Sequence, residues 1–304
     1  MKTMLSVVGA VLAISCFAEE KSESYMKGRR MVVSDYSGGK VCIVEADGTV
    51  SWSHPAPNSN DVWIMPDNAL LFAAGTAVRE VSIADKKVKF EYTSQSTIYG
   101  TQRLPNGNTF VAECSGAKLL EVAPDGKVVK TVVLTPGDNE KGGAYMRNAR
   151  ALPNGHYLVG HYAGNRASEY DADGKEVWSA KLPTGVHSVV RLPNGNTMLA
   201  GADSGPPGLR EFNPAGELVW SLTNEDLADK PLKFMTGFQI LPNGNILLSN
   251  WVGHGQFGKA PHILEVTRDK KVVWTFNDHV NFKTVASVQV FPKKGEKLDI
   301  MNVH

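Results

Sequence analysis

The chain has 304 residues, of which 42% are apolar and 21% charged, and its formal net charge is +1. These values are typical of one large or two small globular domains. They exclude the strongly basic surface that nucleic-acid binding requires, so we expect no nucleic-acid partner.

The first residues, MKTMLSVVGAVLAISCFA, have the pattern of a secretory signal peptide, with Lys2 as an early positive charge before an apolar run. We predict a signal peptide over residues 1–18, a linker over 19–30 and one domain over 31–304. The mature protein is then secreted or periplasmic. Because AISC also resembles a lipobox, lipid attachment at Cys16 is the alternative. No other stretch is apolar enough to span a bilayer, so we expect no transmembrane segment.

A five-residue turn recurs along the chain. The sequence LPNGN occurs at 104–108, 192–196 and 241–245, and the near-copy LPNGH occurs at 152–156. Aligned on the proline of this turn, units recur every 39 to 50 residues, at Pro66, Pro105, Pro153, Pro193, Pro242 and Pro292. Self-similarity at this period indicates a solenoid or a propeller.

A second turn, seen in PDGK, DADGK and NPAGE, leads into strands that resemble VVW. The position five residues on from this turn holds Trp52, Phe90, Lys130, Trp178, Trp220 and Trp274, so that Lys130 is the exception to an aromatic pattern. Asn-Gly and Asp-Gly supply the positive φ that tight hairpins need, and TFVAE, YLVGH and TMLAG alternate with the period of a strand. Each unit therefore predicts four short strands, and such units repeating around an axis make a β-propeller.

The two ends of the chain each hold part of a unit. MVVSDYSGGKVCIVEADGTVSW contains three strands and lacks the first, whereas TVASVQVFPKKG contains a lone first strand. We predict that the strand near Val285–Phe291 pairs with the strand near Met31–Ser34, because an open ring would expose unpaired strand edges. The fold class is therefore all-β, a six-bladed β-propeller of four-stranded antiparallel blades closed by its two terminal strands.

Residues that recur in every unit are interpreted as scaffold. The glutamates Glu80, Glu121, Glu169, Glu211 and Glu265 recur in the third strands and are expected to make contacts between blades, as are the tryptophans of the VVW position. The DADG sequence at 171–174 resembles a calcium loop but occupies an ordinary hairpin position. We therefore predict no metal site.

Only two cysteines, Cys42 and Cys114, follow the predicted signal peptide. The repeat places them two blades apart, and the Cα atoms of a disulfide must lie within about 7 Å of each other. We expect two free thiols, in a protein that is monomeric or weakly associated.

Candidate functional residues come from one face of the disc. In a four-stranded unit both hairpin turns lie on one face, whereas the loops between second and third strands and the connectors between units lie on the other. The hairpin turns are nearly identical from unit to unit, but the second set of loops differs in every unit. A residue that is unique to one unit on this irregular face is therefore a candidate for binding or catalysis.

The innermost strand of each unit enters the central channel six residues before the repeat proline. This position holds Asn60, Tyr99, Arg147, His187, Thr236 and Ala286, and the variable loops add further polar and aromatic residues. The predicted ligand-binding residues are Asp61, Tyr99, Arg147, Asn148, His161, His187, Trp251 and His254. Polar, aromatic and cationic groups that converge on a funnel are typical of small-molecule sites. The alternative is a wetted channel mouth without a ligand.

Two parts of the sequence carry a family resemblance. HSVVRLPNGNTMLAG followed by EFNPAGELVW is similar to the repeat of arylsulfotransferase-like propellers, and DADGKEVW resembles the docking motif of the quinoprotein (pyrroloquinoline quinone) propeller superfamily. The resemblance covers nearly all of the mature chain. It is specific for the fold and says little about function, because one fold hosts many chemistries.

Two functions are compatible with these features. The first is an exported, non-catalytic propeller that binds a small molecule, glycan or protein partner at the irregular face. The second, implied by the resemblance, is an arylsulfotransferase-like enzyme in which His187 attacks the sulfuryl group and Arg147, His161 and His254 assist. Ser188 stands where that family has an aspartate. Quinone-dependent dehydrogenases resemble eight-bladed rings with adjacent cysteines, which this chain lacks, so no cofactor is expected.

Overall fold

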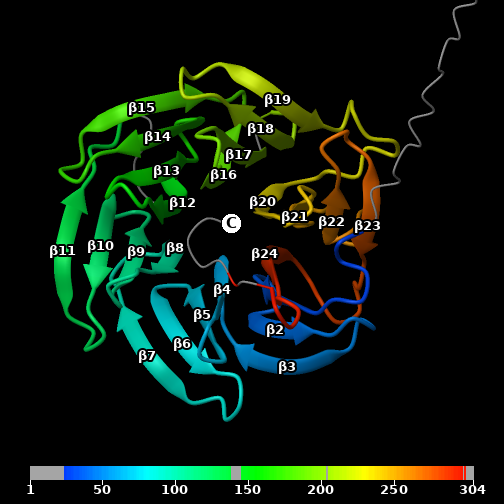
Figure 1. The fold of residues 1–304 in the computed structure, drawn as a ribbon, viewed down its shortest axis with the longest axis horizontal. Coiled ribbons are helices and arrows are strands. Elements are labelled where there is room, and N and C mark those ends of the chain that lie inside the picture. The colour runs from blue at the N-terminus through cyan, green and yellow to red at the C-terminus, as the bar shows by residue number, and fades with distance from the viewer. Residues whose placement is uncertain (1–23, 138–144, 203–204, 297, 299–304) are drawn as a thin grey trace, which may run out of the picture.

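The computed structural model describes residues 24–137, 145–202, 205–296 and 298. Within these ranges the chain forms six sheets of four strands and no helix. The sheets surround a central axis as the blades of a propeller (Figure 1). The predicted all-β, six-bladed architecture is confirmed.

The blades are numbered from the one that contains both ends of the folded chain. Blade 1 consists of β24 (Val285–Val290), β1 (Met31–Asp35), β2 (Lys40–Val44) and β3 (Val50–Pro55); blade 2 of β4 (Asp61–Met65), β5 (Ala69–Ala74), β6 (Ala77–Ser82) and β7 (Val88–Thr93); and blade 3 of β8 (Ile98–Arg103), β9 (Thr109–Glu113), β10 (Lys118–Val122) and β11 (Val128–Val133). Blade 4 consists of β12 (Met146–Ala151), β13 (Tyr157–His161), β14 (Arg166–Tyr170) and β15 (Glu176–Lys181); blade 5 of β16 (Gly185–Arg191), β17 (Thr197–Ala202), β18 (Gly208–Phe212) and β19 (Leu218–Thr223); and blade 6 of β20 (Met235–Ile240), β21 (Ile246–Asn250), β22 (Ile263–Val266) and β23 (Val272–Phe276).

The repeated LPNGN turn is the hairpin between the first and second strands of a blade. In blade 3 the amide of Leu104 donates to the carbonyl of Asn108 at 2.8 Å, and the amide of Gly107 donates back to Leu104 at 3.0 Å. Gly107 has a φ of 85°, and Gly155, Gly195 and Gly244 adopt the same left-handed conformation in the other copies. A side chain at this position would be strained, which explains why the turn keeps its glycine in every copy.

The ring closes where the two ends of the folded chain meet. β1 pairs antiparallel with β24, with Met31 opposite Val290 and Ser34 opposite Ser287. The amide of Phe291 extends this pairing by donating to the carbonyl of Arg30 at 3.0 Å. The predicted closure by the terminal strands is confirmed.

The first strand of each blade has no further strand on its axial side, so its backbone groups need other partners. Three glutamines supply them from the neighbouring blade. The side-chain oxygen of Gln102 accepts from the amide of Ala151 at 3.1 Å, and Gln239 accepts in the same way from Val290 at 2.9 Å. Gln289 accepts from Ile64 at 2.5 Å. At three of the six blade junctions, a backbone amide and a glutamine of neighbouring blades are thus joined by a hydrogen bond in the channel wall.

Contacts between neighbouring blades confirm the scaffold role for three of the recurring glutamates. Glu80, Glu169 and Glu211 form ion pairs with Arg103, Arg191 and Arg268, each of which belongs to the next blade. Glu265 instead accepts hydrogen bonds from the amides of Tyr25 at 2.7 Å and Met26 at 3.0 Å. The described part of the predicted linker, residues 24–30, is thus packed against blade 6.

The predicted signal peptide and Cys16 lie outside the described residues. In the part that the structure describes, no helical segment has the length and apolar character needed to cross a membrane.

Removal of β24 tests ring closure. A chain that ends at Asn281 loses the innermost strand of blade 1 and leaves β1 as a bare edge, so its midpoint of thermal or urea unfolding should fall well below that of the full chain. A chain that ends at Leu298 keeps β24 and is the matched control. Equal unfolding midpoints for the full chain and the chain ending at Asn281 would contradict the closure argument.

The two cysteines test the burial of the blade interiors. Cys42 and Cys114 are free and buried, and burial raises the pKa of both thiols. A thiol reagent should therefore leave both unmodified in the native protein and modify both after denaturation without reductant, since the thiolate is the reactive form. Fast reaction of either thiol in the native protein would contradict this packing.

Candidate functional site

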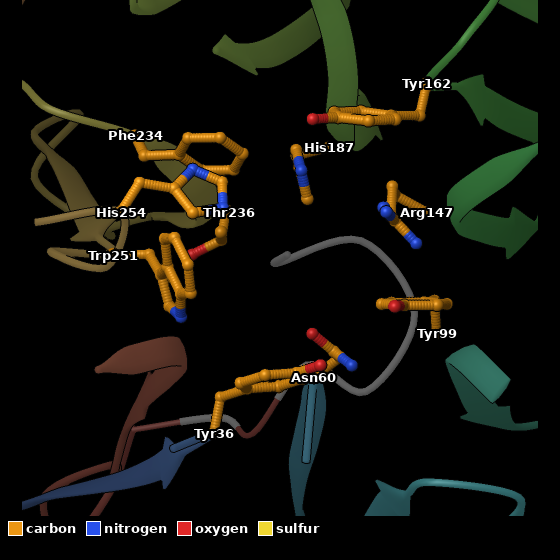
Figure 2. Close-up of a pocket in the computed structure, with 10 residues that line it drawn as sticks. All are labelled: Tyr36, Asn60, Tyr99, Arg147, Tyr162, His187, Phe234, Thr236, Trp251 and His254. Atoms are coloured by element: carbon orange, nitrogen blue, oxygen red, sulfur yellow. The ribbon is translucent and has the colours of Figure 1, made fainter. Parts of the chain in front are cut away.

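A pocket opens at the channel mouth, on the face that carries the irregular loops (Figure 2). Its cavity volume is about 140 Å³. The lining residues are Tyr36, Asn60, Tyr99, Arg147, Tyr162, His187, Phe234, Thr236, Trp251 and His254, so that every blade contributes at least one. His254 is exposed, and the other side chains are partly buried.

Four of the lining residues lie at β-bulges of the innermost strands. In blade 4, Met146 pairs with His161 and Asn148 with Gly160, which leaves Arg147 as an extra residue. The same interruption falls at Tyr99 in β8, His187 in β16 and Thr236 in β20. A bulge inserts one residue and re-aims its side chain. Figure 2 shows these four side chains directed into one space at the axis.

A second repeated position supplies three aromatic rings. Tyr36, Tyr162 and Trp251 each follow directly after the second strand of a blade. The amide of Tyr36 donates to the carbonyl of Thr284 at 2.9 Å, that of Tyr162 to Tyr145 at 3.1 Å, and that of Trp251 to Phe234 at 2.8 Å. Each acceptor lies two residues before the channel-entry position of the same blade. This hydrogen bond holds each ring beside the channel entry.

Glycines give two of these rings room to lie against the backbone. A Cβ atom on Gly253 would stand 2.0 Å from the indole of Trp251, and one on Gly185 would stand 2.6 Å from the ring of Tyr162. Neither distance is sterically possible, so any larger residue would displace the ring from the pocket wall.

The rings form a continuous arc around the pocket. His187 stands edge-on to Tyr162 and Phe234, with ring centroids 4.9 and 4.8 Å apart. Phe234 then contacts Trp251 at 5.2 Å, and Trp251 contacts His254 at 4.9 Å. Edge-to-face pairs at these distances are mutually stabilising, so the arc is held by its own contacts.

Arg147 is held between two tyrosine rings. Its guanidinium carbon lies 4.4 Å from the ring centroid of Tyr99 and 4.6 Å from that of Tyr162. A cation placed over an aromatic face is attracted by the ring quadrupole, and two rings fix the guanidinium plane. Burial raises the pKa of Tyr99 to about 12, which outweighs the opposing effect of Arg147, so its hydroxyl stays protonated.

His187 is a neutral imidazole at neutral pH. Burial, together with the electrostatic effect of the nearby Arg147 and His254 side chains, holds its pKa well below the ordinary value. Counting partners only among the described residues, Nε2 of His187 and Oγ1 of Thr236 are buried without a hydrogen bond. Such atoms carry a desolvation cost that a bound ligand or water removes.

Three predicted residues lie outside the pocket because the fold uses them elsewhere. The Asp61 carboxylate accepts two hydrogen bonds from the Arg150 guanidinium, at 2.8 and 3.0 Å, and one from the amide of Thr101 at 2.9 Å. Asn148 follows the bulged residue and is 5% exposed. His161 is fully buried, with Nε2 2.9 Å from the hydroxyl of Tyr170. The other five predicted residues, Tyr99, Arg147, His187, Trp251 and His254, line the pocket together.

The remaining lining residues were not among the predicted set. Tyr36 and Tyr162 align with the predicted Trp251 directly after the second strands of their blades, and this aromatic recurrence is a signal that the sequence contains. Phe234 stands two residues before the bulge, where blade 4 has Tyr145. A cofactor is not indicated by the lining. Within the described ranges no group of three or more His, Cys, Asp or Glu side chains is placed to hold a metal ion.

Comparisons with known proteins place the fold. No protein-family profile and no curated protein matches the chain. A Bacteroides caccae protein of unknown function has a similar crystal structure, with a TM-score of 0.78 and 23% identity over 88% of this chain and 100% of that chain. A catalytically inactive variant of virginiamycin B lyase from Staphylococcus aureus, solved with quinupristin, has a TM-score of 0.58 and 14% identity, over 82% of this chain and 80% of that chain. Hydrazine synthase of Kuenenia stuttgartiensis has a TM-score of 0.58 and 15% identity, over 86% of this chain and 81% of that chain.

These likenesses show the β-propeller fold, with virginiamycin B lyase among the structural neighbours. The propeller fold implied by the sequence resemblance is confirmed. The narrower resemblance to arylsulfotransferase-like propellers stays a prediction.

The depressed pKa of His187 predicts an acid-sensitive contribution to stability. Because the folded protein favours the neutral imidazole, this contribution is complete above the unfolded pKa of about 6.5 and is lost as pH falls below it. His187→Gln cannot titrate, so its thermal midpoint should fall less than that of the wild type between pH 7.5 and pH 5. Parallel losses in the two proteins would contradict a buried neutral imidazole.

Proposed function

We propose that this protein is an exported propeller that binds a small, ring-containing anion at the channel mouth. The observation that carries the proposal is the guanidinium of Arg147, placed between the rings of Tyr99 and Tyr162 at 4.4 and 4.6 Å, on the same pocket wall as the partly buried imidazole of His187. The N-terminal pattern supports a location outside the cytoplasm, secreted or periplasmic.

The charge of the lining supports an anionic ligand. None of the ten lining residues is an aspartate or a glutamate, whereas Arg147 carries a permanent positive charge. The planar guanidinium can donate two parallel hydrogen bonds to a carboxylate or sulfate. Two tyrosine faces fix its plane, so less conformational entropy is lost when a ligand binds.

The shape of the lining supports a single ring. A cavity of about 140 Å³ is smaller than the sites of drug-sized ligands, which range from about 300 to 1,000 Å³. Trp251 and Phe234 offer flat apolar faces opposite Arg147 (Figure 2). His187 Nε2 and Thr236 Oγ1 are placed to hydrogen-bond a substituent of the ring. An aryl sulfate, an aryl carboxylate or a sugar acid meets these requirements.

Binding of phenyl sulfate and benzoate tests the proposal. Calorimetry, or a change in tryptophan fluorescence that is lost in Trp251→Phe, should detect both ligands and should detect phenol much more weakly. Arg147→Ala should weaken binding by ~10- to 100-fold, because a hydrogen bond to a charged group contributes about 1.5–3 kcal/mol. Arg147→Lys should recover part of this loss, since it restores the charge without the planar donor pair.

The matched control is Arg79→Ala, which removes an arginine that pairs with Glu91 at 2.8 Å far from the mouth. It should leave binding unchanged. An equal loss in Arg79→Ala and Arg147→Ala, or equal affinity for phenol and phenyl sulfate, would refute the proposed site. Release of nitrophenol from nitrophenyl sulfate that is lost in His187→Ala would replace the binding function with the arylsulfotransferase-like alternative.

A further inference from the structure

Three blade junctions share one arrangement of an arginine, an aromatic ring and a glutamate. At the junction of blades 2 and 3, Arg103 forms an ion pair with Glu80, and its guanidinium carbon lies 5.1 Å from the ring centroid of Phe90. The same set recurs as Arg191, Glu169 and Trp178 between blades 4 and 5, and as Arg268, Glu211 and Trp220 between blades 5 and 6. The scaffold glutamate is thus normally matched by a stacked guanidinium.

The junction of blades 3 and 4 keeps the glutamate and lacks the guanidinium. Ala151 lies two residues before the repeat proline, where Arg103 and Arg191 lie in their blades. Lys130 occupies the position that is aromatic in the other five units. Two large groups of the arrangement are therefore absent from the same junction.

A groove occupies the space at this junction. Its volume is about 430 Å³, roughly three times that of the mouth pocket. We define this junction groove by Leu104, Glu121, Lys130, Ala151, Leu152 and Tyr157, which all line it. Because the LPNGN and LPNGH hairpins also line it, the groove opens on the face opposite the mouth.

The carboxylate of Glu121 has weak partners compared with its counterparts. The hydroxyl of Tyr157 donates to it at 3.5 Å, and the ammonium of Lys130 lies 3.9 Å away. By contrast, Arg268 contacts Glu211 at 2.6 Å. A separation of 3.9 Å is too long for a hydrogen bond, so Glu121 keeps most of its capacity to accept.

We propose that the junction groove is a second binding site, for a small organic cation that carries a guanidinium or amidinium group. In this site Glu121 accepts two parallel N–H bonds, and the ring of Tyr157 offers a face to the cation. The apolar side chains of Leu104, Ala151 and Leu152 contact the carbon part of the ligand. The site thus accepts from a ligand the group that the chain itself supplies at three other junctions.

Lys130 is the competing cation of the chain itself. Its ammonium lies 5.2 Å from the ring centroid of Tyr157, and its side chain is 38% exposed. A guanidinium displaces it because the planar fork forms two hydrogen bonds to Glu121, whereas the ammonium at 3.9 Å forms none. When it moves aside, Lys130 gives up its contact with Tyr157, and the guanidinium takes the same place over the ring.

Agmatine and benzamidine are the probes that test the groove. NMR titration or calorimetry of the full chain should detect both, and should detect butylamine at least ~10-fold more weakly because an ammonium lacks the planar donor pair. Glu121→Gln should weaken agmatine binding by at least ~10-fold, since it removes the charge that the cation pairs with. Lys130→Met should strengthen binding by removing the competitor.

Ala151→Arg provides the sharpest variant. It restores the arrangement of the neighbouring junctions, so it should abolish agmatine binding and raise the thermal midpoint. Glu91→Gln changes an exposed carboxylate on β7 and is the matched control, with agmatine binding unchanged. Saturating phenyl sulfate should not compete with agmatine, because the two sites lie on opposite faces.

The proposal fails if the wild type binds neither agmatine nor benzamidine. It also fails if Glu121→Gln, with a wild-type thermal midpoint, retains full affinity for agmatine. Competition between phenyl sulfate and agmatine would place the cation at the mouth and overturn the second site.

Discussion

The pairing of β1 with β24 is the constraint on which the rest of the structure depends. Most contacts of each blade are with its two neighbours, so the ring transmits stability from blade to blade. Closure brings six innermost strands to one axis, where their free backbone edges must find partners. Gln102, Gln239 and Gln289 provide them from the adjacent blade. These three bonds join neighbouring blades at the channel wall itself.

The mouth pocket is formed where the innermost strands depart from regular β-pairing. A bulge adds one residue to the innermost strand, and the hydrogen bond after the second strand holds a further side chain beside it. Both devices belong to the scaffold, whereas the side chains they present differ from blade to blade. Arg147 and His187 therefore occupy equivalent bulge positions, and Trp251 occupies the position that Tyr162 has in its blade, so one scaffold presents different side-chain chemistry in each blade.

The sequence predicted the fold because turn chemistry and strand period agree in every unit. It also placed Arg147 and His187 at the channel entry and Trp251 and His254 in a variable loop of the same face, and these four residues line one pocket. Asp61 and His161 were predicted on the same face but make buried contacts outside the pocket, because a polar residue there can equally serve the fold. Asp61 binds Arg150, which belongs to a blade that is not its neighbour. Among the described residues such a pair occurs once in the ring, so the repeat pattern of the sequence does not predict it. The bulges are also invisible in the sequence, because they depend on register between strands.

Comparison of equivalent positions in the blades distinguishes scaffold residues from candidate functional residues on both faces of the disc. A scaffold contact that recurs in several blades sets an expectation for each of the others, and a blade that departs from it must compensate physically. At the junction of blades 3 and 4 the compensation is partial. Here the cation, Lys130, stands at the position that is aromatic in the other units, and the ring, Tyr157, comes from the next blade. The ammonium of Lys130 lies 3.9 Å from the Glu121 carboxylate. Stability alone favours an arginine at position 151, since two neighbouring blades have one. Glu265 also lacks a guanidinium, but the amides of Tyr25 and Met26 satisfy it, whereas Glu121 has no such partners among the described residues; the proposed second site rests on this difference.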